Sequence, residues 1–401
     1  MSLEHPNFGR KTGNFFEVLW AFFQLGLTSF GGPVAHIGYF REAFVVRRRW
    51  LDEQSYADLV AMCQFLPGPA SSQVGMGIGL LRAGFFGAFM AWIGFTLPSA
   101  LAMILFAYGV GYVDLATQGG WLHGLKVVAV AVVAQAVWGM AKTLCPDRNR
   151  ATLAILSAMV VLIWPTVIGQ LLAIGMGALV GWYFLEGKGD VPTGRVFLPM
   201  ARSTGGIFLV LFGLLLFLFP LLVTTDVAPW IQIFERFYRV GSLVFGGGHV
   251  VLPLLQTEVV GSGWLNQELF LAGYGAAQAV PGPLFTFAAY LGAAMPFGPS
   301  GWIGGGLALA AVFLPSFLLV VGALPFWEML RRKPVAQSIL RGVNASVVGL
   351  LVAALYHPVW TNAIFSSLDF ALALASFTLL MFWKTPPWLV VFLAGSLYAL
   401  F

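Results

Sequence analysis

Two motifs near the start of the sequence combine residue types that bind small anions. Gly31-Gly32-Pro33 and Pro67-Gly68-Pro69 each interrupt strongly apolar sequence in which a helix would otherwise continue. Glycine lets the backbone approach a ligand without a Cβ, and proline suits the first turn of the next helix. The free N–H groups at a helix start, with the positive end of the helix dipole, favour an oxyanion. Side chains that can add hydrogen bonds accompany the second motif at Gln64, Ser71, Ser72 and Gln73.

Both motifs recur in the second half of the chain. Gly246-Gly247-Gly248 lies 215 positions after the first motif, and Pro281-Gly282-Pro283 lies 214 positions after the second. A third block, Leu97-Pro98-Ser99, recurs 217 positions later as Leu314-Pro315-Ser316. Paired interruptions in the two halves of an apolar chain point to a transporter's binding site, so we predict that the four breaks form the substrate site. The second proline motif is also accompanied by an amide and a hydroxyl, at Gln278 and Thr286.

The composition is that of an integral membrane protein. Apolar residues make up 59% of the 401 residues and charged residues only 9%, and the mean hydropathy is +0.87. Soluble domains carry about 25% charged residues. We therefore predict an all-α polytopic protein embedded in the lipid bilayer, with room for roughly ten spans of about 20 residues.

The pieces of helix around the breaks have about 10 to 15 residues and are too short to cross a bilayer upright. We predict that they form re-entrant hairpins, and that the chain consists of two repeats at 1–186 and 227–401. Residues 187–226 are expected to supply a loop and one unpaired span. The basic loops gather on one face of the membrane when the second repeat is inverted relative to the first. The predicted fold is therefore an inverted repeat of broken-helix hairpins.

Several function classes lack their signatures in this sequence. It contains no Gly-x-x-x-x-Gly-Lys-Ser/Thr phosphate loop and no His-Glu-x-x-His metal motif. Cys63 and Cys145 are too isolated to suggest a disulfide framework or a thiolate metal site. The net charge of +5 fits cytoplasmic loops and does not require nucleic acid as a partner. We predict that the protein is not an enzyme and uses neither a metal nor a cofactor.

A few charged residues lie away from the predicted loop ends, where they are costly and often functional. The candidates for the counter-charge of a divalent oxyanion are Arg236, Arg239, Arg341 and Lys126. The alternative is that these cations reach to an interface or pair with Glu235 or Glu258. Two histidines near the glycine motifs could carry a coupled proton, although such a residue can also be purely structural. The candidate proton carriers are His36, His249, Glu42, Glu258 and Asp58.

These motifs together resemble those of the chromate ion transporter family, in its long form with two homologous halves. The resemblance rests on Phe30-Gly31-Gly32-Pro33, Trp50-Leu51, the run from Gln64 to Pro69, Phe245 to His249, and Val280 to Pro283. It covers nearly the whole chain. The two halves differ at the first motif, where Gly248 stands in place of Pro33, so we expect them to be functionally unequal.

The resemblance implies a multi-pass protein of the bacterial inner membrane that exports chromate and confers chromate resistance. The family's transport is driven by the proton gradient or the membrane potential, and sulfate is the expected competitor. A homodimer is a candidate assembly. The alternatives are a carrier or channel for sulfate or another small oxyanion, and, from a different class, a membrane-embedded enzyme or an assembly subunit.

Overall fold

A computed structural model describes residues 13–112, 115–185, 201–223, 227–245, 248–330 and 333–399. Every regular element among these residues is helical, as the sequence predicts. Six of the helices are long and apolar enough to cross a membrane. This is fewer than the roughly ten spans expected from the total apolar length, because much of the apolar sequence lies in shorter helices.

The first half begins with the predicted broken helices. The glycine motif separates α1 (Phe15–Thr28) from α2 (Gly32–Arg41), and the proline motif separates α3 (Glu53–Phe65) from α4 (Ala70–Tyr112). The remaining helices of this half are α5 (Leu115–Leu144), α6 (Arg148–Ile163) and α7 (Val167–Phe184). A single helical run, Arg202–Leu222, then contains α8 (Arg202–Gly213) and α9 (Phe219–Leu222). Only 6% of its most apolar window is buried, as suits a span that faces lipid.

The second half repeats this order with more interruptions. Gly248, the described residue of its glycine motif, follows α10 (Pro229–Leu243) and begins a short 3₁₀ turn, Gly248–Val250, which leads into α11 (Val251–Val259). After the proline motif, the counterpart of α4 consists of two separate helices. The elements in order are α12 (Gln267–Ala279), α13 (Phe287–Ala294), α14 (Gly301–Ala323), α15 (Trp327–Leu330), α16 (Pro334–Ala354), α17 (Ser367–Met381) and α18 (Pro387–Ala399).

Helix α4 is in fact a tight helical hairpin. Its backbone leaves helical geometry at Ala83 and Gly84, whereas no such departure occurs at Pro98. The two arms of α4 meet at Gly79 and Gly87, where a Cβ on either residue would collide with the carbonyl oxygen of the other. Gly292 on α13 and Gly304 on α14 make the corresponding contact in the second half. Glycine is needed here because the backbones of the two arms touch.

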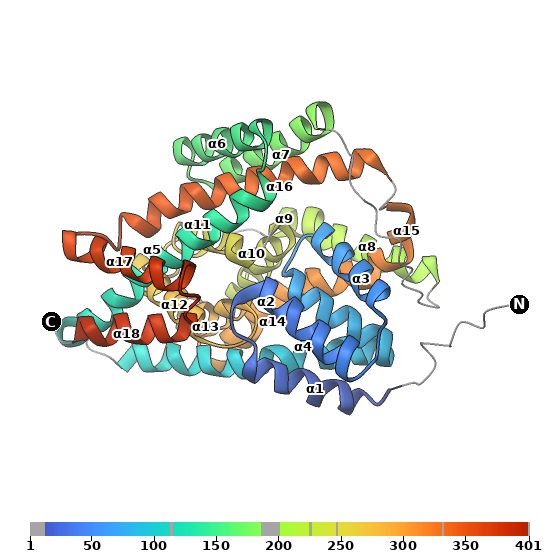
Figure 1. Ribbon diagram of the computed structural model, residues 1–401, viewed down its shortest axis with the longest axis horizontal. Helices are drawn as coiled ribbons and strands as arrows, with labels where there is room; N and C mark the ends of the chain where they lie inside the picture. Colours follow the sequence, from blue (N-terminus) through green and yellow to red (C-terminus); the bar gives the residue numbers. More distant parts are fainter. Residues whose placement is uncertain are drawn as a thin grey trace, which may run out of the picture.

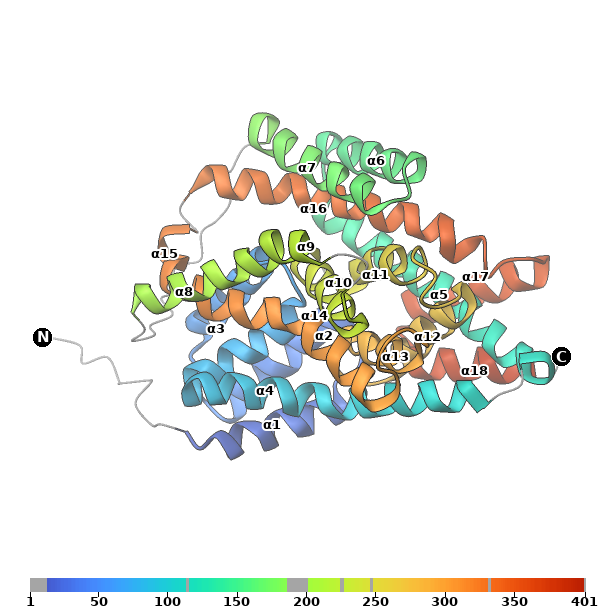
Figure 2. The same cartoon turned by 180° about the vertical axis from the view of Figure 1, so that it is seen from behind.

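The broken helices of the two halves meet near the middle of the molecule and extend to opposite sides of it. In Figure 1, α2, α3 and the first part of α4 lie toward one end of the long axis, and α11, α12 and α13 toward the other. Figure 2 shows the same opposition from behind. This arrangement agrees with the predicted two-half architecture.

The last two helices of each half pack on the other half. α6 and α7 lie along α16, and α17 and α18 lie along α5 (Figure 1). On one side Ser157 Oγ donates a hydrogen bond to Ser346 Oγ at 2.9 Å. On the other side His123 Nε2 lies 2.8 Å from Asp369 Oδ1. Helices of each predicted repeat therefore pack on helices of the other, and this packing does not mark a boundary between them. The division into repeats at 1–186 and 227–401 stays a prediction.

The glycine contact within α4 predicts a specific loss of stability. Gly79→Ala should lower the free energy of unfolding by about 1 to 3 kcal/mol, because the new methyl group must push the two arms apart. Gly109→Ala is the matched control on the same helix, since a Cβ there meets no atom within 4 Å. It should be neutral or slightly stabilising, because alanine favours helix. Thermal melting of the two purified variants in detergent tests this, and equal melting temperatures would contradict it.

Candidate functional site

Two backbone hydrogen bonds join the breaks of one half to those of the other. Gly68 N donates to Val244 O at 2.6 Å, and Gly282 N donates to Ser29 O at 2.8 Å. The two donors are equivalent glycines of the proline motifs, and the two acceptors are equivalent positions just before the glycine motifs. The contacts are therefore reciprocal, as a two-fold relation between the halves requires.

We call this region the four-break junction. It consists of residues 29–33, 66–69, 244–245 with 248, and 280–283; Gly246 and Gly247 of the predicted site lie outside the described residues. A Cβ on Gly248 would lie 3.7 Å from Pro33 Cγ and 3.8 Å from Leu284 Cβ, so the breaks also meet in van der Waals contact. The structure thus brings together the described parts of all four predicted breaks.

The junction requires glycine at its two amide donors. Gly68 has φ of +118° and Gly282 has φ of +100°, in a region that other residues rarely adopt. A Cβ on Gly68 would lie 2.5 Å from Ser316 Oγ, and one on Gly282 would lie 2.8 Å from Ser99 Oγ. The repeated Leu-Pro-Ser blocks therefore place their serines against the two proline motifs.

Two helices begin at the junction with free amide groups. α2 starts at Gly32 with Pro33 in its first turn, and a Cβ on Gly32 would meet no atom within 4 Å. In α4 the first helical bond runs from Gln73 N to Pro69 O at 3.0 Å. The N–H groups of residues 70–72 therefore precede the helical ladder, and the positive end of the helix dipole lies at the break.

Polar side chains of the first half gather beside these helix starts. His36 Nδ1 lies 3.4 Å from Ser71 Oγ, and Gln73 Nε2 donates to Pro67 O at 2.6 Å. Several buried polar atoms here have no hydrogen-bond partner among the residues that the structure describes, although such groups are normally paired. They are Ser29 Oγ, His36 Nε2, Ser72 Oγ, Gln73 Oε1, Thr96 Oγ1 and Ser316 Oγ.

The predicted site residues of the second half are more fully satisfied within the protein. Thr286 Oγ1 donates to Pro283 O at 2.9 Å, and His249 Nδ1 lies 3.0 Å from the hydroxyl of Tyr274. Gln278 is half-buried at the end of α12, with Nε2 unpaired. Its counterpart Gln64 is exposed at the end of α3.

The candidate arginines of α10 belong to an ion-pair network. Arg239 Nη2 lies 3.0 Å from Glu258 Oε1, and Arg239 Nε lies 3.1 Å from Glu235 Oε1. Arg236 Nη1 donates to Glu258 O at 3.0 Å, and its guanidinium lies 4.2 Å from the ring centre of Trp264. The four side chains border a cavity of about 510 Å³. The alternative interpretation of these arginines, pairing with Glu235 and Glu258, is the one that the structure displays.

The other candidate charges lie away from the junction or have partners of their own. Lys126 Nζ lies 3.4 Å from Glu268 Oε1 at the start of α12, roughly 15 Å along that helix from the break that follows its end. Glu42 is exposed and pairs with Arg47 at 2.9 Å. Asp58, also considered as a proton carrier, accepts a hydrogen bond from Trp327 Nε1 at 2.9 Å. Arg341 is half-buried on α16.

Sequence reasoning missed three of the unpaired polar groups at the junction, namely Ser29, Thr96 and Ser316. Ser316 carried a signal, because it belongs to a repeated block at nearly the same offset as the breaks. Ser29 directly precedes the glycine motif but is an ordinary residue type for a membrane helix. Thr96 carried no signal that separates it from other threonines in apolar sequence.

Comparison with known proteins identifies the relatives of this chain. The model of the chromate transporter family matches residues 16–182 and 231–399. This chain belongs to the chromate transporter family. The two matched segments follow the two halves of the fold, and the resemblance inferred from the motifs is confirmed.

Relatives of this chromate transporter family member span most of its length. An uncharacterized transporter of Methanocaldococcus jannaschii is 27% identical over 350 residues, covering 86% of this chain and 84% of the relative. A probable chromate transport protein of Synechococcus elongatus is 26% identical over 353 residues, covering 87% and 84%. A chromate transport protein of Pseudomonas aeruginosa is 26% identical over 346 residues, covering 83% and 78%. No solved structure matches this chain.

Family membership and the six apolar helices together make this a multi-pass membrane protein. They also agree with the absence of enzyme signatures from the sequence, since the family is one of transporters. The site residues at the junction are not assigned by these comparisons and rest on the geometry described above.

The ion-pair network predicts strong coupling between α10 and α11 in this chromate transporter family member. Glu258→Gln and Arg239→Gln should each lower the melting temperature, and the double variant should lose less than the sum of the two. We expect a coupling free energy of about 1 kcal/mol or more, because Glu258 and Glu235 are buried and share Arg239.

The control for this cycle is the exposed pair of Arg41 and Glu53, whose side chains are 51% and 57% exposed. Its coupling should stay below about 0.5 kcal/mol, because water screens exposed ion pairs. Equal coupling in the two cycles, measured by chemical or thermal unfolding in detergent, would show that the network on α10 does not hold the two helices together.

Proposed function

We propose that this protein is a secondary active transporter that exports chromate across the bacterial inner membrane and confers chromate resistance. The observation that carries the proposal is the four-break junction, in a chain that belongs to the chromate transporter family. Non-helical backbone deep in a membrane protein is tolerated where it is buried in protein or lines a wet cavity. Unpaired hydroxyls and free helix-start amides at such a place suit a small oxyanion that must leave its hydration shell.

The two-fold relation of the halves supports transport by alternating access. In inverted-repeat transporters the substrate site lies where the repeats meet, and one repeat or bundle moves relative to the other around it. The bonds from Gly68 to Val244 and from Gly282 to Ser29 lie at such a meeting place. Small movements of the halves would change the access to the junction from the two faces of the membrane. The proton gradient or the membrane potential is the proposed driving force.

Sulfate is the competing substrate that we consider, because it is a tetrahedral dianion like chromate. Hydroxyl and amide donors recognise oxygen atoms and charge, which the two anions share, so selectivity must come from small differences in size. A carrier whose first substrate is sulfate is therefore the alternative function.

The proposal predicts gradient-dependent chromate flux. Inverted membrane vesicles that contain the protein should accumulate labelled chromate in a saturable manner when a gradient is imposed, and uncouplers should abolish the accumulation. Vesicles without the protein are the control. Flux that favours sulfate over chromate would support the alternative carrier, non-saturable flux would indicate a channel, and the absence of any anion flux would contradict transport.

The geometry of the junction predicts that its glycines are essential for this flux. Gly68→Ala and Gly282→Ala should each reduce chromate flux at least tenfold, because alanine is strained at these φ values and collides with Ser316 or Ser99. Gly38→Ala on α2 is the control, since a Cβ there meets no atom within 4 Å. Protein levels in the vesicles, measured by immunoblot, separate lost transport from lost protein. Wild-type flux in both junction variants would show that transport does not depend on this geometry.

A further inference from the structure

The two halves have equivalent backbone hydrogen bonds at the junction but place different side chains around them. Polar residues of the first half are matched in the second half, at the repeat offsets of 214 to 217 positions, by apolar ones. The pairs are Ser29 with Val244, His36 with Val251, Ser71 with Phe285, Gln73 with Phe287, and Thr96 with Phe313. All ten side chains are buried, so the difference lies in the chemistry and not in the exposure.

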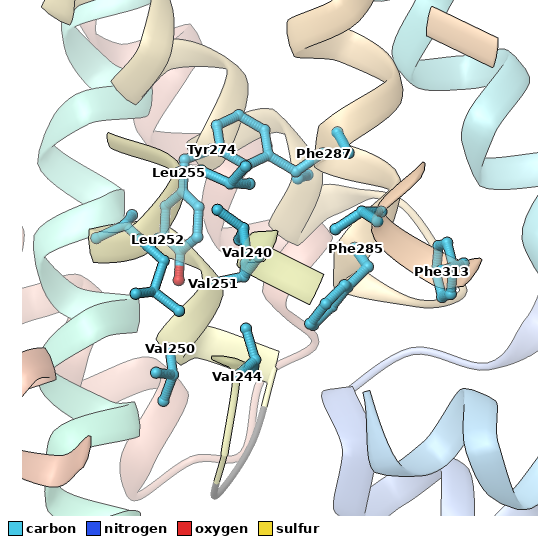
Figure 3. Packing of buried hydrophobic residues seen from close by; sticks show 14 of the residues in the cluster. Val240, Val244, Val250, Val251, Leu252, Leu255, Tyr274, Phe285, Phe287 and Phe313 are labelled. Carbon is cyan, nitrogen blue, oxygen red and sulfur yellow. The ribbon is translucent and has the colours of Figure 1, made fainter. Parts of the chain in front are cut away.

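The second-half side of the junction is a packed apolar cluster. Figure 3 shows Val244, Val251, Phe285, Phe287 and Phe313 among the buried hydrophobic side chains there. Thr286 is the polar exception, and its hydroxyl is already used by Pro283 O at 2.9 Å. An oxyanion placed on this side would lose its hydration and find few donors in return, among them Gln278 Nε2.

The first-half side offers unpaired polar groups next to a helix start. Ser72 lies in the first turn of α4 and is 3% exposed, and its Oγ has no hydrogen-bond partner in the described part of the chain. Gln73 Nε2 uses one hydrogen for Pro67 O and has a second one free for another acceptor. The unpaired atoms on this side also include an acceptor, Gln73 Oε1. An acceptor cannot bond an anion directly, but it can bond a water molecule or a proton that accompanies the anion.

One residue of the second half is directed into this first-half side. Ser316 on α14 is fully buried, and its Oγ has no hydrogen-bond partner within the described ranges of the chain. A Cβ on Gly68 would lie 2.5 Å from Ser316 Oγ and 2.7 Å from Gln73 Nε2, so both polar atoms adjoin the same point beside the break. The equivalent serine, Ser99, instead donates its hydroxyl to Thr96 O at 3.0 Å.

We propose that the oxyanion binds on the first-half side of the junction, held by Ser72, Gln73 and the free amides of α4, and that Ser316 completes the site. This assignment rests on the proposed function as an oxyanion transporter. The donors are neutral groups and a helix dipole, since the nearby arginines of α10 are held by Glu235 and Glu258. The site therefore draws on both halves, and the second half contributes mainly the hydroxyl of Ser316.

The test uses the full chain reconstituted in liposomes, with chromate and sulfate as probes. Ser72→Ala and Ser316→Ala should each raise the apparent KM for chromate about tenfold, because each removes a hydrogen bond to a charged oxygen. Ser242→Ala is the matched control, since Ser242 is equally buried but its hydroxyl already donates to Tyr238 O at 2.8 Å. Its KM should stay at the wild-type value.

A second measurement separates binding from folding. Without anion, Ser316→Ala should melt at or above the wild-type temperature, because the lost hydroxyl has no hydrogen-bond partner among the described residues. Added chromate should raise the melting temperature of the wild type and of Ser242→Ala, but less that of Ser72→Ala and Ser316→Ala.

Two outcomes would overturn the assignment, and they are distinguishable. An unchanged KM and an unchanged chromate-induced shift in both junction variants would remove the anion from this side while the proposed function stands. The same holds if the affinity loss occurs in Gln278→Met or His249→Phe instead. A wild-type protein that neither transports nor is stabilised by chromate or sulfate would overturn the proposed function itself, and the assignment with it.

Discussion

The fold depends on the satisfaction of backbone amides at places where apolar helices stop. A break inside a membrane protein leaves N–H and C=O groups without helical partners, and lipid offers none. Here each half supplies what the other lacks, since Gly68 donates to Val244 and Gly282 donates to Ser29. The constraint explains why both donors are glycines with positive φ, and why the two halves must meet at their breaks.

Beyond these shared backbone hydrogen bonds, different interactions hold together the helices on either side of the glycine motif in each half. In the first half α1 and α2 are held by aromatic packing, with the ring centres of Phe22 and Phe40 separated by 5.5 Å. In the second half α10 and α11 are held by ion pairs between Arg239 and Glu258. Aromatic packing is insensitive to salt and charge, whereas buried ion pairs depend on both partners. The two halves also differ in side-chain polarity at the junction, where polar residues of the first half correspond to apolar residues of the second.

The sequence predicted features that follow from local chemistry and missed those that depend on helix crossings. Adjacent glycines and the Pro-Gly-Pro sequence interrupt an apolar helix through their own backbone preferences, so the breaks and the repeat were predictable. The contact of Ser316 with the Gly68 break was not, because it depends on how α14 crosses the start of α4. Arg239 is a residue whose role the sequence predicted only in part. Its pairing with Glu258 could be named as an alternative, but only the fold of α11 against α10 distinguishes it from a free counter-charge.

The exchange of terminal helices between the halves has a consequence for biosynthesis. α6 and α7 leave the ribosome well before α16, which begins at Pro334, and α16 supplies the surface that they cover. Until that helix is made, the small residues on α7, such as Gly177 and Gly181, have only lipid or another chain to contact. The first half therefore cannot reach its final packing during its own insertion. Assembly of this protein is a late event, completed when the last helices, α17 and α18, close onto α5.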